Sequence, residues 1–189
     1  MPKLVFAFAG QIASGKGTAT KYLVEKYGAN SYRFSTMLRD ILDRLYLDQS
    51  RENMQKLSTI LRSNFGEDLF SKVIASDVKK DKKNIIAVDG ARRPSDFAYL
   101  KKEASCKIIY IEADIEKRYE RIIKRVENPD DRKKTFEQFK KDHKGEAELK
   151  IKDLKKEADY IIDNDSDQHH LYEQINGIIK KVNRNNASI

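Results

Sequence analysis

Residues that cross-link small proteins or bind metals are scarce in this sequence: its 189 residues include one cysteine, three histidines and no tryptophan. A single cysteine excludes a disulfide framework and a multi-cysteine zinc site. Cys106 lies in an apolar run, 106–111, so we expect a buried, unreactive thiol. The histidines (His143, His169 and His170) stand in polar stretches, which favours neither a metal site nor an acid–base role for them.

Long hydrophobic runs are also missing. No segment is long and apolar enough to cross a bilayer, and the first residues have too short an apolar stretch for a signal peptide. We therefore expect a cytoplasmic protein with no membrane partner. A chain of this length forms about one domain and can bury a core without cross-links.

Charge, in contrast, is abundant: 36% of the residues are charged and the formal net charge is +8. The lysine runs, such as 79–83, are scattered along the chain and often stand beside acids. No basic stripe interleaved with aromatic residues is visible, so a solvated surface is favoured over a nucleic-acid interface. The positive excess also suits a small polyanionic substrate.

The strongest motif is a glycine-rich loop with the spacing G-x-x-x-x-G-K, from Gly10 to Lys16. It follows the apolar run Leu4–Ala9, typical of a buried strand, and precedes a segment, 17–26, with the pattern of a helix. In this context the loop amides surround an anion that the helix dipole also attracts, and the lysine reaches the outer phosphates. We predict a nucleoside triphosphate site formed by Gly10, Ala13, Ser14, Gly15, Lys16, Gly17 and Thr18.

Apolar runs of strand type alternate along the chain with segments of helical period. This order predicts an α/β fold of three layers, with about five parallel strands and helices on both faces. The expected strands are Leu4–Ala9, Tyr32–Phe34, Ile85–Val88, Lys107–Glu112 and Tyr160–Ile162. The expected helical faces are Ile41/Leu42/Leu45, Leu57/Ile60/Leu61 and Tyr119/Ile122/Ile123/Val126.

Two spacings between strands are too long for simple crossovers. Because ligands bind at the carboxyl ends of the strands in such sheets, we interpret residues about 35–80 as a substrate-binding insertion and about 118–157 as a lid. Extra structural helices are the alternative. The core of this single domain then comprises 1–34, 84–114 and 158–183, and we expect residues 183–189 to be frayed.

One position departs from the general loop pattern: Gly17 stands where a Ser or Thr usually ligates Mg²⁺, and Thr18 follows. G-K-G-T is the variant of adenylate kinases, so the chain resembles the nucleoside monophosphate kinase group of P-loop proteins, to which dephospho-CoA and deoxynucleotide kinases are related. The resemblance implies a P-loop NTPase fold, ATP as donor and Mg²⁺ held largely through water. It also implies that Thr18 lies near the α-phosphate and is at most a weak metal ligand.

An acid, Asp89, follows the apolar run 85–88. In a P-loop fold such an acid acts through Mg²⁺ or its water shell, so we predict that Asp89 is a catalytic and metal-binding residue. The continuation Ala91-Arg92-Arg93-Pro94 is similar to the D-G-F-P-R segment of adenylate kinases, whose arginine contacts the monophosphate. The resemblance implies that Arg92 or Arg93 binds an acceptor phosphate, which a planar guanidinium contacts in bidentate fashion. It does not choose between the two, and an ion pair is the alternative for one of them.

The segment Phe34–Arg39 is similar to the S-T-G-D-M-L-R motif of adenylate kinases, shortened by two residues. The resemblance implies that Ser35 and Arg39 bind the acceptor. Ser35 also fits the N-cap of the following helix, with Arg39 about one turn further along the same face. A surface arginine is the alternative for Arg39.

A charged helical segment begins at Asp114 and carries Arg118, Arg121 and Arg125 at spacings of three and four, which predicts a basic ridge opposite the apolar face. In related kinases, lid arginines stabilise the transferring phosphoryl group. The resemblance therefore implies catalytic roles for Arg121 and Arg125 and donor binding for Arg118, with Asp131–Arg132 as a further candidate. An ordinary helix laced with ion pairs is the alternative.

The segment Ala158–Asn164 is similar to an A-D-Y-x-I-x-N strand of related kinases, whose following turn lies near the adenine. The resemblance implies that Asn164 contacts the donor nucleotide. A turn followed by a helix cap explains the same residues.

Together, the residues and the resemblance predict an ATP-dependent phosphotransferase that moves the γ-phosphoryl group to a nucleoside or deoxynucleoside monophosphate. Dephospho-CoA kinase or another small-molecule kinase is the alternative, although the segment Tyr32–Ser35 lacks the acid that would activate a hydroxyl. A nucleotide switch or nucleic-acid-associated ATPase is the alternative of another class. We expect a small phosphorylated acceptor as partner, and a monomer or homodimer.

Overall fold

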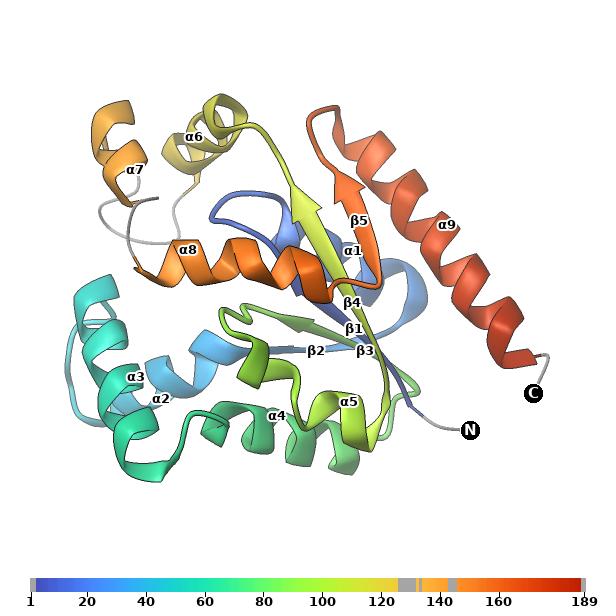
Figure 1. Cartoon of the computed structure of the whole chain (residues 1–189), viewed down its shortest axis with the longest axis horizontal. Helices are drawn as coiled ribbons and strands as arrows, with labels where there is room; N and C mark the ends of the chain where they lie inside the picture. The colour runs from blue at the N-terminus through green and yellow to red at the C-terminus, as the bar shows by residue number, and fades with distance from the viewer. Residues whose placement is uncertain (1–2, 126–131, 133, 143–145, 188–189) are drawn as a thin grey trace.

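The computed structural model describes residues 3–125, 132, 134–142 and 146–187. Within these residues the chain forms a parallel sheet of five strands in the order β2-β3-β1-β4-β5 (Figure 1). The strands are β1 (Leu4–Ala9), β2 (Asn30–Arg33), β3 (Ile85–Asp89), β4 (Ser105–Glu112) and β5 (Tyr160–Asp163). The predicted α/β fold is confirmed.

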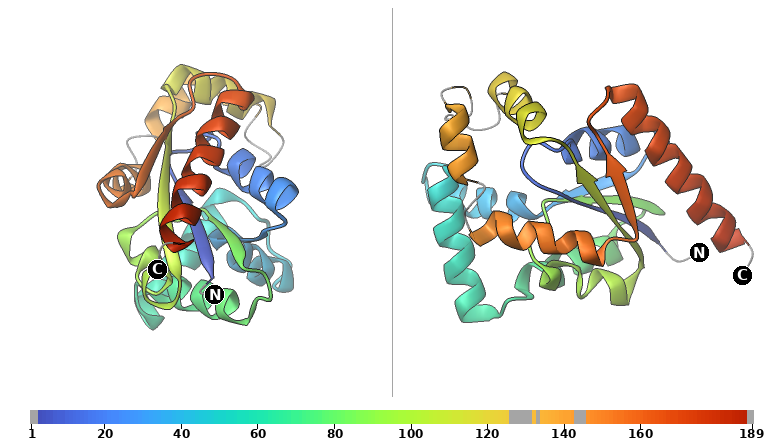
Figure 2. Two further views of the ribbon diagram at one scale, coloured as in Figure 1. Left: turned by 90° about the vertical axis from the view of Figure 1, so that its right-hand side faces the viewer. Right: turned by 45° about the horizontal axis from the view of Figure 1, so that its top comes forward.

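Helices cover both faces of the sheet, so the molecule has three layers. One face packs against α1 (Lys16–Tyr27) and α9 (Gln168–Ala187). The other packs against α2 (Phe34–Arg44), α4 (Leu69–Lys80), α5 (Leu100–Glu103) and α8 (Glu146–Asp153). The end-on view in Figure 2 shows α1 and α8 on opposite sides of the sheet. The remaining α-helices are α3 (Arg51–Phe65), α6 (Ile115–Lys124) and α7 (Phe136–Asp142).

The central strand β1 is apolar throughout because both of its faces are covered. Val5 and Ala7 belong to one buried cluster, and Phe6 and Phe8 belong to the other, since successive side chains of a strand point to opposite faces. Each large side chain buried in this way contributes about 1.5–3 kcal/mol to stability.

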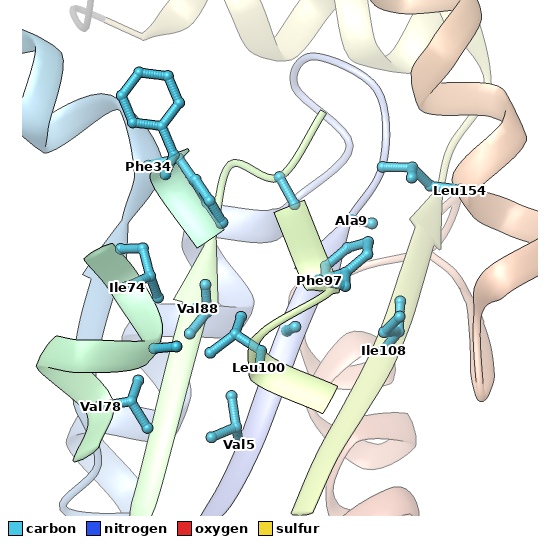
Figure 3. Close-up of a cluster of buried hydrophobic side chains, with 14 of the residues drawn as sticks. Val5, Ala9, Phe34, Ile74, Val78, Val88, Phe97, Leu100, Ile108 and Leu154 are labelled. Atoms are coloured by element: carbon cyan, nitrogen blue, oxygen red, sulfur yellow. The ribbon is translucent and has the colours of Figure 1, made fainter. Parts of the chain in front are cut away.

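The buried hydrophobic cluster between the sheet and helices α4 and α5 fixes the segment that follows β3. Figure 3 shows Phe97 and Leu100 beside Val5, Val88 and Ile108. Phe97 lies in the short 3₁₀ helix η1 (Pro94–Phe97), and both it and Leu100 are fully buried. The chain between Asp89 and Leu100 is therefore fixed at one end by the sheet and at the other by the core.

The prediction that Ser35 caps a helix is wrong. Helix α2 already begins at Phe34, and Arg33 occupies the N-cap position with an extended backbone. The strand register holds Arg33 opposite Asp89, and the Phe34 ring is buried, so the chain turns into the helix one residue earlier than expected.

Two predicted helical faces are narrower than expected. Helix α2 ends at Arg44, which leaves Leu45 56% exposed. In α3, Leu57 and Leu61 pack against the core, but Ile60 is 58% exposed because it lies about 100° away from Leu61 around the helix axis. Of the third predicted face, Val126 lies outside the described residues.

The prediction that the chain is frayed from residue 183 is wrong for residues 183–187, because helix α9 continues to Ala187. Residues 188 and 189 lie outside the described residues. Among the helices that the structure describes, none combines the length and the apolar character needed to cross a membrane.

Cys106 lies in β4, is half-buried, and packs against the core. Burial, with the neighbouring Asp159 carboxylate, raises the pKa of the Cys106 thiol to about 12. At pH 8 a raised pKa lowers the thiolate fraction, and the thiolate is the reactive form. We expect iodoacetamide to alkylate Cys106 at least roughly tenfold more slowly in the native protein than in 8 M urea, as followed by mass spectrometry. Equal rates would show that the thiol is not protected.

Candidate active site

The glycine-rich loop and Asp89 lie at the carboxyl edge of the sheet. The glycine-rich loop joins the end of β1 to the start of α1, while Arg33 and Asp89 end the neighbouring strands β2 and β3. Ligands of parallel α/β sheets bind at this edge.

The loop is packed so closely that two of its glycines have no room for a side chain. Gly10 has φ 142°, and a Cβ atom there would lie 2.2 Å from the carbonyl oxygen of Ile111. Gly15 has φ 110°, and its Cβ would lie 2.2 Å from Nδ2 of Asn164. Ala13 also has a positive φ, 60°. The backbone therefore follows a path that exposes successive amides rather than side chains.

The polar groups of the loop suit an anion. The Lys16 ammonium donates hydrogen bonds to the carbonyl oxygens of Gly10 (2.8 Å) and Gln11 (2.9 Å), which holds its charge against the loop. Ser14 Oγ and Gln11 Nε2 are buried, with no hydrogen-bond partner among the described residues. The first turn of α1 has no acid to oppose a phosphate, and Thr18 lies there half-buried. The residues thus fit the phosphates of a nucleotide.

Asp89 is buried, at 5% exposed, at the end of β3. Its Oδ2 lies 3.7 Å from Nε of Arg33, and its Oδ1 is buried without a hydrogen-bond partner in the described part of the chain. An unused carboxylate oxygen of this kind suits Mg²⁺ or one of its waters. The described residues contain no cluster of three or more His, Cys, Asp or Glu placed to hold a metal.

Asn164 supports the loop from behind. Its side chain is buried and donates from Nδ2 to the carbonyl oxygen of Ser14 at 2.7 Å, while its backbone N–H donates to the Glu112 carbonyl oxygen at 2.9 Å. The Asn164 amide therefore positions the loop, a role that the sequence did not suggest. A contact of this turn with the donor base stays a prediction.

The arginines of α6 do not form the predicted ridge opposite the apolar face. Arg118 is 4% exposed and shares a face with the buried Ile122, four residues further on. Its Nε donates to the Ala113 carbonyl oxygen (2.8 Å), and its Nη1 lies 3.4 Å from the loop carbonyl oxygen of Ile12. The guanidinium also lies over the Phe139 ring of α7, at 5.9 Å. Arg118 is buried because backbone carbonyls and an aromatic ring replace its water.

The other two arginines of the predicted lid, Arg121 and Arg125, lie closer to the surface. Arg121 Nη2 donates to the Asn164 carbonyl oxygen at 2.7 Å, so it reaches the residue that supports the loop. Arg121 Nη1 is buried with no hydrogen-bond partner in the residues described. Arg125 follows the last turn of α6 and is half-buried. Asp131 lies outside the described residues, and Arg132 is exposed.

The predicted acceptor residues lie on α2 and after β3. Arg39 donates from Nη1 to Gln49 Oε1 at 2.8 Å, and Ser35 is half-buried, with its Oγ lacking a partner among the described residues. Arg93 is paired with the Glu67 carboxylate, and the side chain of Arg92 is exposed.

Three residues near the acceptor side escaped prediction: Arg33, Arg62 and Asp96. Arg62 Nη2 donates to Asp96 Oδ1 at 2.7 Å, and both side chains are buried. A signal for Asp96 was present, because an acid two residues after Pro94 fits the first turn of a short helix. Arg62 carried no such signal, since its partner is 34 residues away.

A cavity of about 410 Å³ adjoins the loop at Gln11. It lies at the ends of β4 and β5, where Glu112 and Asp163 line it together with Lys152 and Lys155. The carboxyl edge of the sheet is therefore hollowed beside the glycine-rich loop, at the ends of β4 and β5.

A glycine-rich phosphate loop on the central strand of a 2-3-1-4-5 parallel sheet, with an acid ending the adjacent strand, defines a P-loop nucleotide-binding domain of kinase-like fold. The family model described as AAA domain matches residues 9–140, and the chain belongs to this family.

Relatives extend the likeness over nearly the whole chain. A UPF0200 protein of Staphylothermus marinus is 29% identical over 189 residues, which cover 99% of this chain and 97% of the relative. A UPF0200 protein of Sulfurisphaera tokodaii is 28% identical over 180 residues, which cover 94% and 97%.

Two solved structures of kinases share the fold. A shikimate kinase from Bacteroides thetaiotaomicron has a TM-score of 0.63 at 14% identity and covers 97% of this chain and 99% of its own. A gluconokinase from Sinorhizobium meliloti has a TM-score of 0.62 at 11% identity and covers 97% and 95%. At these identities the likeness shows the fold alone.

Proposed function

We propose that the protein is an ATP-dependent phosphotransferase that moves the γ-phosphoryl group to a nucleoside or deoxynucleoside monophosphate. The observation that carries the proposal is a phosphate loop at the same sheet edge as the pair of Arg33 and Asp89. Arg33 supplies positive charge beside Asp89, where an acceptor phosphate would lie.

The donor side is formed by the loop. Its amides and Lys16 hold the β- and γ-phosphates, and the dipole of α1 adds to their attraction. Asn164 holds the loop through its hydrogen bond to the Ser14 carbonyl oxygen. Asp89 would hold Mg²⁺ through its unused oxygen, and the metal would neutralise charge that develops between the phosphates.

The acceptor side favours a phosphate over a hydroxyl. β2 ends in Arg33, whose guanidinium lies beside the Asp89 carboxylate, so this edge carries a positive charge. A phosphate oxygen is already an adequate nucleophile, and a guanidinium binds it through charge-assisted hydrogen bonds. Positive charge at this point therefore suits a monophosphate acceptor.

The reaction then needs positioning and charge neutralisation rather than a general base. An oxygen of the acceptor phosphate forms a bond to the γ-phosphorus while the bond from that phosphorus to the β,γ-bridging oxygen breaks, which leaves ADP. Lys16 stabilises the charge on the leaving oxygens. Arg121 on α6 and Arg125 directly after that helix, both within the predicted lid, stabilise the transferring group and help exclude water.

A panel of acceptors tests the proposal. ATP and Mg²⁺ are incubated with AMP, CMP, UMP, GMP, the deoxynucleoside monophosphates or dephospho-CoA, and ADP is followed by a coupled assay. We expect ADP formation to depend on at least one monophosphate. Turnover with dephospho-CoA alone would favour a hydroxyl acceptor, and ADP formation without any acceptor would favour an ATPase. Either outcome contradicts the proposal.

A further inference from the structure

We propose that Arg118 is a positioning residue of the phosphate loop, which holds the peptide unit between Ile12 and Ala13 in the orientation that a bound phosphate needs. The inference rests on the donor half of the proposed function and concerns what keeps the loop in its anion-binding shape. The resemblance implied a different role for Arg118, a direct contact with the donor nucleotide.

The orientation of a loop N–H group follows from the carbonyl group of the same peptide unit. A trans peptide unit is planar, and its C=O and N–H bonds point in opposite directions. A donor that holds a loop carbonyl on one side therefore aims the N–H group of the next residue to the other side. A phosphate needs several N–H groups aimed at one point, and carbonyl oxygens turned away from it.

Arg118 holds one of the loop carbonyls in this way. Its Nη1 lies 3.4 Å from the carbonyl oxygen of Ile12, which belongs to the same peptide unit as the Ala13 N–H group. The guanidinium carries a positive charge, which strengthens its attraction to a carbonyl oxygen. The contact therefore turns the Ala13 N–H group away from α6 and toward the phosphate side of the loop.

Asn164 holds a second loop carbonyl from the same side. Its Nδ2 donates to the carbonyl oxygen of Ser14 at 2.7 Å, in the same peptide unit as the Gly15 N–H group. The fit is close, since a Cβ atom on Gly15 would lie 2.2 Å from this Nδ2. Two segments that are distant in the chain thus support neighbouring peptide units of one loop.

The backbone of Ala13 shows why the loop needs this support. Its φ is 60°, a left-handed conformation that costs a residue with a side chain about 1–2 kcal/mol. Rotation of the peptide unit before Ala13 would relieve that cost and would turn the Ile12 carbonyl oxygen toward the phosphates. A loop that spends part of its time in the rotated state binds more weakly in proportion to the fraction lost.

Arg118 is itself held by two further elements. Its Nε donates to the Ala113 carbonyl oxygen at 2.8 Å, where β4 leads into α6, and its guanidinium lies 5.9 Å from the ring of Phe139 in α7. The Arg118 side chain is 4% exposed. Its place behind the loop is therefore set by the fold.

Calorimetric titration with inorganic tripolyphosphate and Mg²⁺ tests the inference, because this anion has the phosphates of a nucleotide but neither base nor ribose. We expect Arg118→Met to raise the Kd for tripolyphosphate and the Kd for ATP by the same factor, about 10–100-fold. Lys124→Met removes a charge from the exposed end of the same helix and is the matched control. Weaker binding of ATP alone would indicate a contact with base or ribose and would overturn the inference, as would unchanged binding of both.

Ala13→Gly separates support of the loop from a direct contact with the phosphates, because glycine adopts a positive φ without this cost. In the Ala13→Gly background, the loss of tripolyphosphate affinity caused by Arg118→Met should be at least about fivefold smaller than in the wild-type background. Equal losses in the two backgrounds would mean that Arg118 contacts the phosphates or acts only through overall stability, and would overturn the inference.

Arg118→Lys is the milder variant, since it keeps the charge but loses the planar fork that contacts the carbonyl oxygens of Ala113 and Ile12 together. It should raise the Kd for tripolyphosphate at least about threefold. The ¹³C shift of the Ile12 carbonyl, recorded by NMR without ligand, should move upfield in Arg118→Lys and stay unchanged in Lys124→Met. An Ile12 shift that does not respond to Arg118→Lys would overturn the positioning role.

These measurements need no acceptor and no turnover, so they separate the two proposals. If no acceptor in the panel is used, the proposed function fails, and the binding data still decide the role of Arg118. If Arg118→Met binds tripolyphosphate as tightly as the wild-type protein, the inference fails and the proposed function stands.

Discussion

Replacing Lys16 by methionine is expected to lower kcat for phosphoryl transfer roughly a thousandfold while the protein stays folded. One well-placed donor to developing negative charge is worth about 10²–10³-fold in kcat, and a full positive charge beside the leaving phosphates belongs at the upper end of that range. Methionine keeps the length and the apolar stem of lysine, so the change removes the ammonium with little loss of packing.

The fold should tolerate this change because the Lys16 ammonium bonds to the carbonyl oxygens of Gly10 and Gln11, which are groups of the loop itself. Losing such partly exposed hydrogen bonds costs about 0.5–1.5 kcal/mol each. The free energy of unfolding, measured in urea, should therefore fall by no more than a few kcal/mol.

Lys21→Met provides the matched control. Lys21 lies on the same helix, its side chain is 74% exposed, and it forms an ion pair with the exposed Glu25. Exposed pairs of this kind contribute about 0–1 kcal/mol, so both kcat and stability should stay close to wild type. Activity of Lys16→Met within tenfold of wild type would contradict the assignment of the loop.

The sequence predicted those parts of the site that are local in the chain. The phosphate loop needs only a strand, a few glycines and a helix start, all within residues 4–26, and the structure has each of them in place. The acid at Asp89 was also visible, because an apolar run that ends in an acid marks the end of a buried parallel strand.

Contacts between distant segments could not be predicted in this way. Asn164 lies 150 residues from Ser14, and Arg62 lies 34 residues from Asp96. Arg118 illustrates the same limit: a charged residue on an amphipathic helix favours solvent, yet here the carbonyl oxygens of Ala113 and Ile12 and the Phe139 ring surround it. The helical period of the sequence places such a residue on one face of the helix. Which groups contact that face depends on how the other helices and loops pack against it.

Gly10→Ala and Gly17→Ala should have opposite effects on stability, although both place a methyl group in the same loop region. At Gly10 the backbone has φ 142°, a conformation that costs an L-residue about 1–3 kcal/mol, and the new Cβ would lie 2.2 Å from the Ile111 carbonyl oxygen. Ile111 is in β4, hydrogen-bonded to β1 and β5, so this oxygen has no room to withdraw. We expect a loss of at least about 3 kcal/mol in the free energy of unfolding.

Gly17 is the internal control because a Cβ there meets no atom within 4 Å and the residue is helical. Alanine in a helix is about 1 kcal/mol more favourable than glycine, so Gly17→Ala should raise the melting temperature by about 2–4 °C.

Equilibrium dialysis with labelled ATP should show that Gly10→Ala abolishes nucleotide binding at temperatures where it is still folded, because its loop amides no longer converge. A Gly10→Ala protein that is as stable as wild type and still binds ATP would contradict the backbone conformation described for Gly10. It would also contradict the phosphate-binding loop on which the donor site depends.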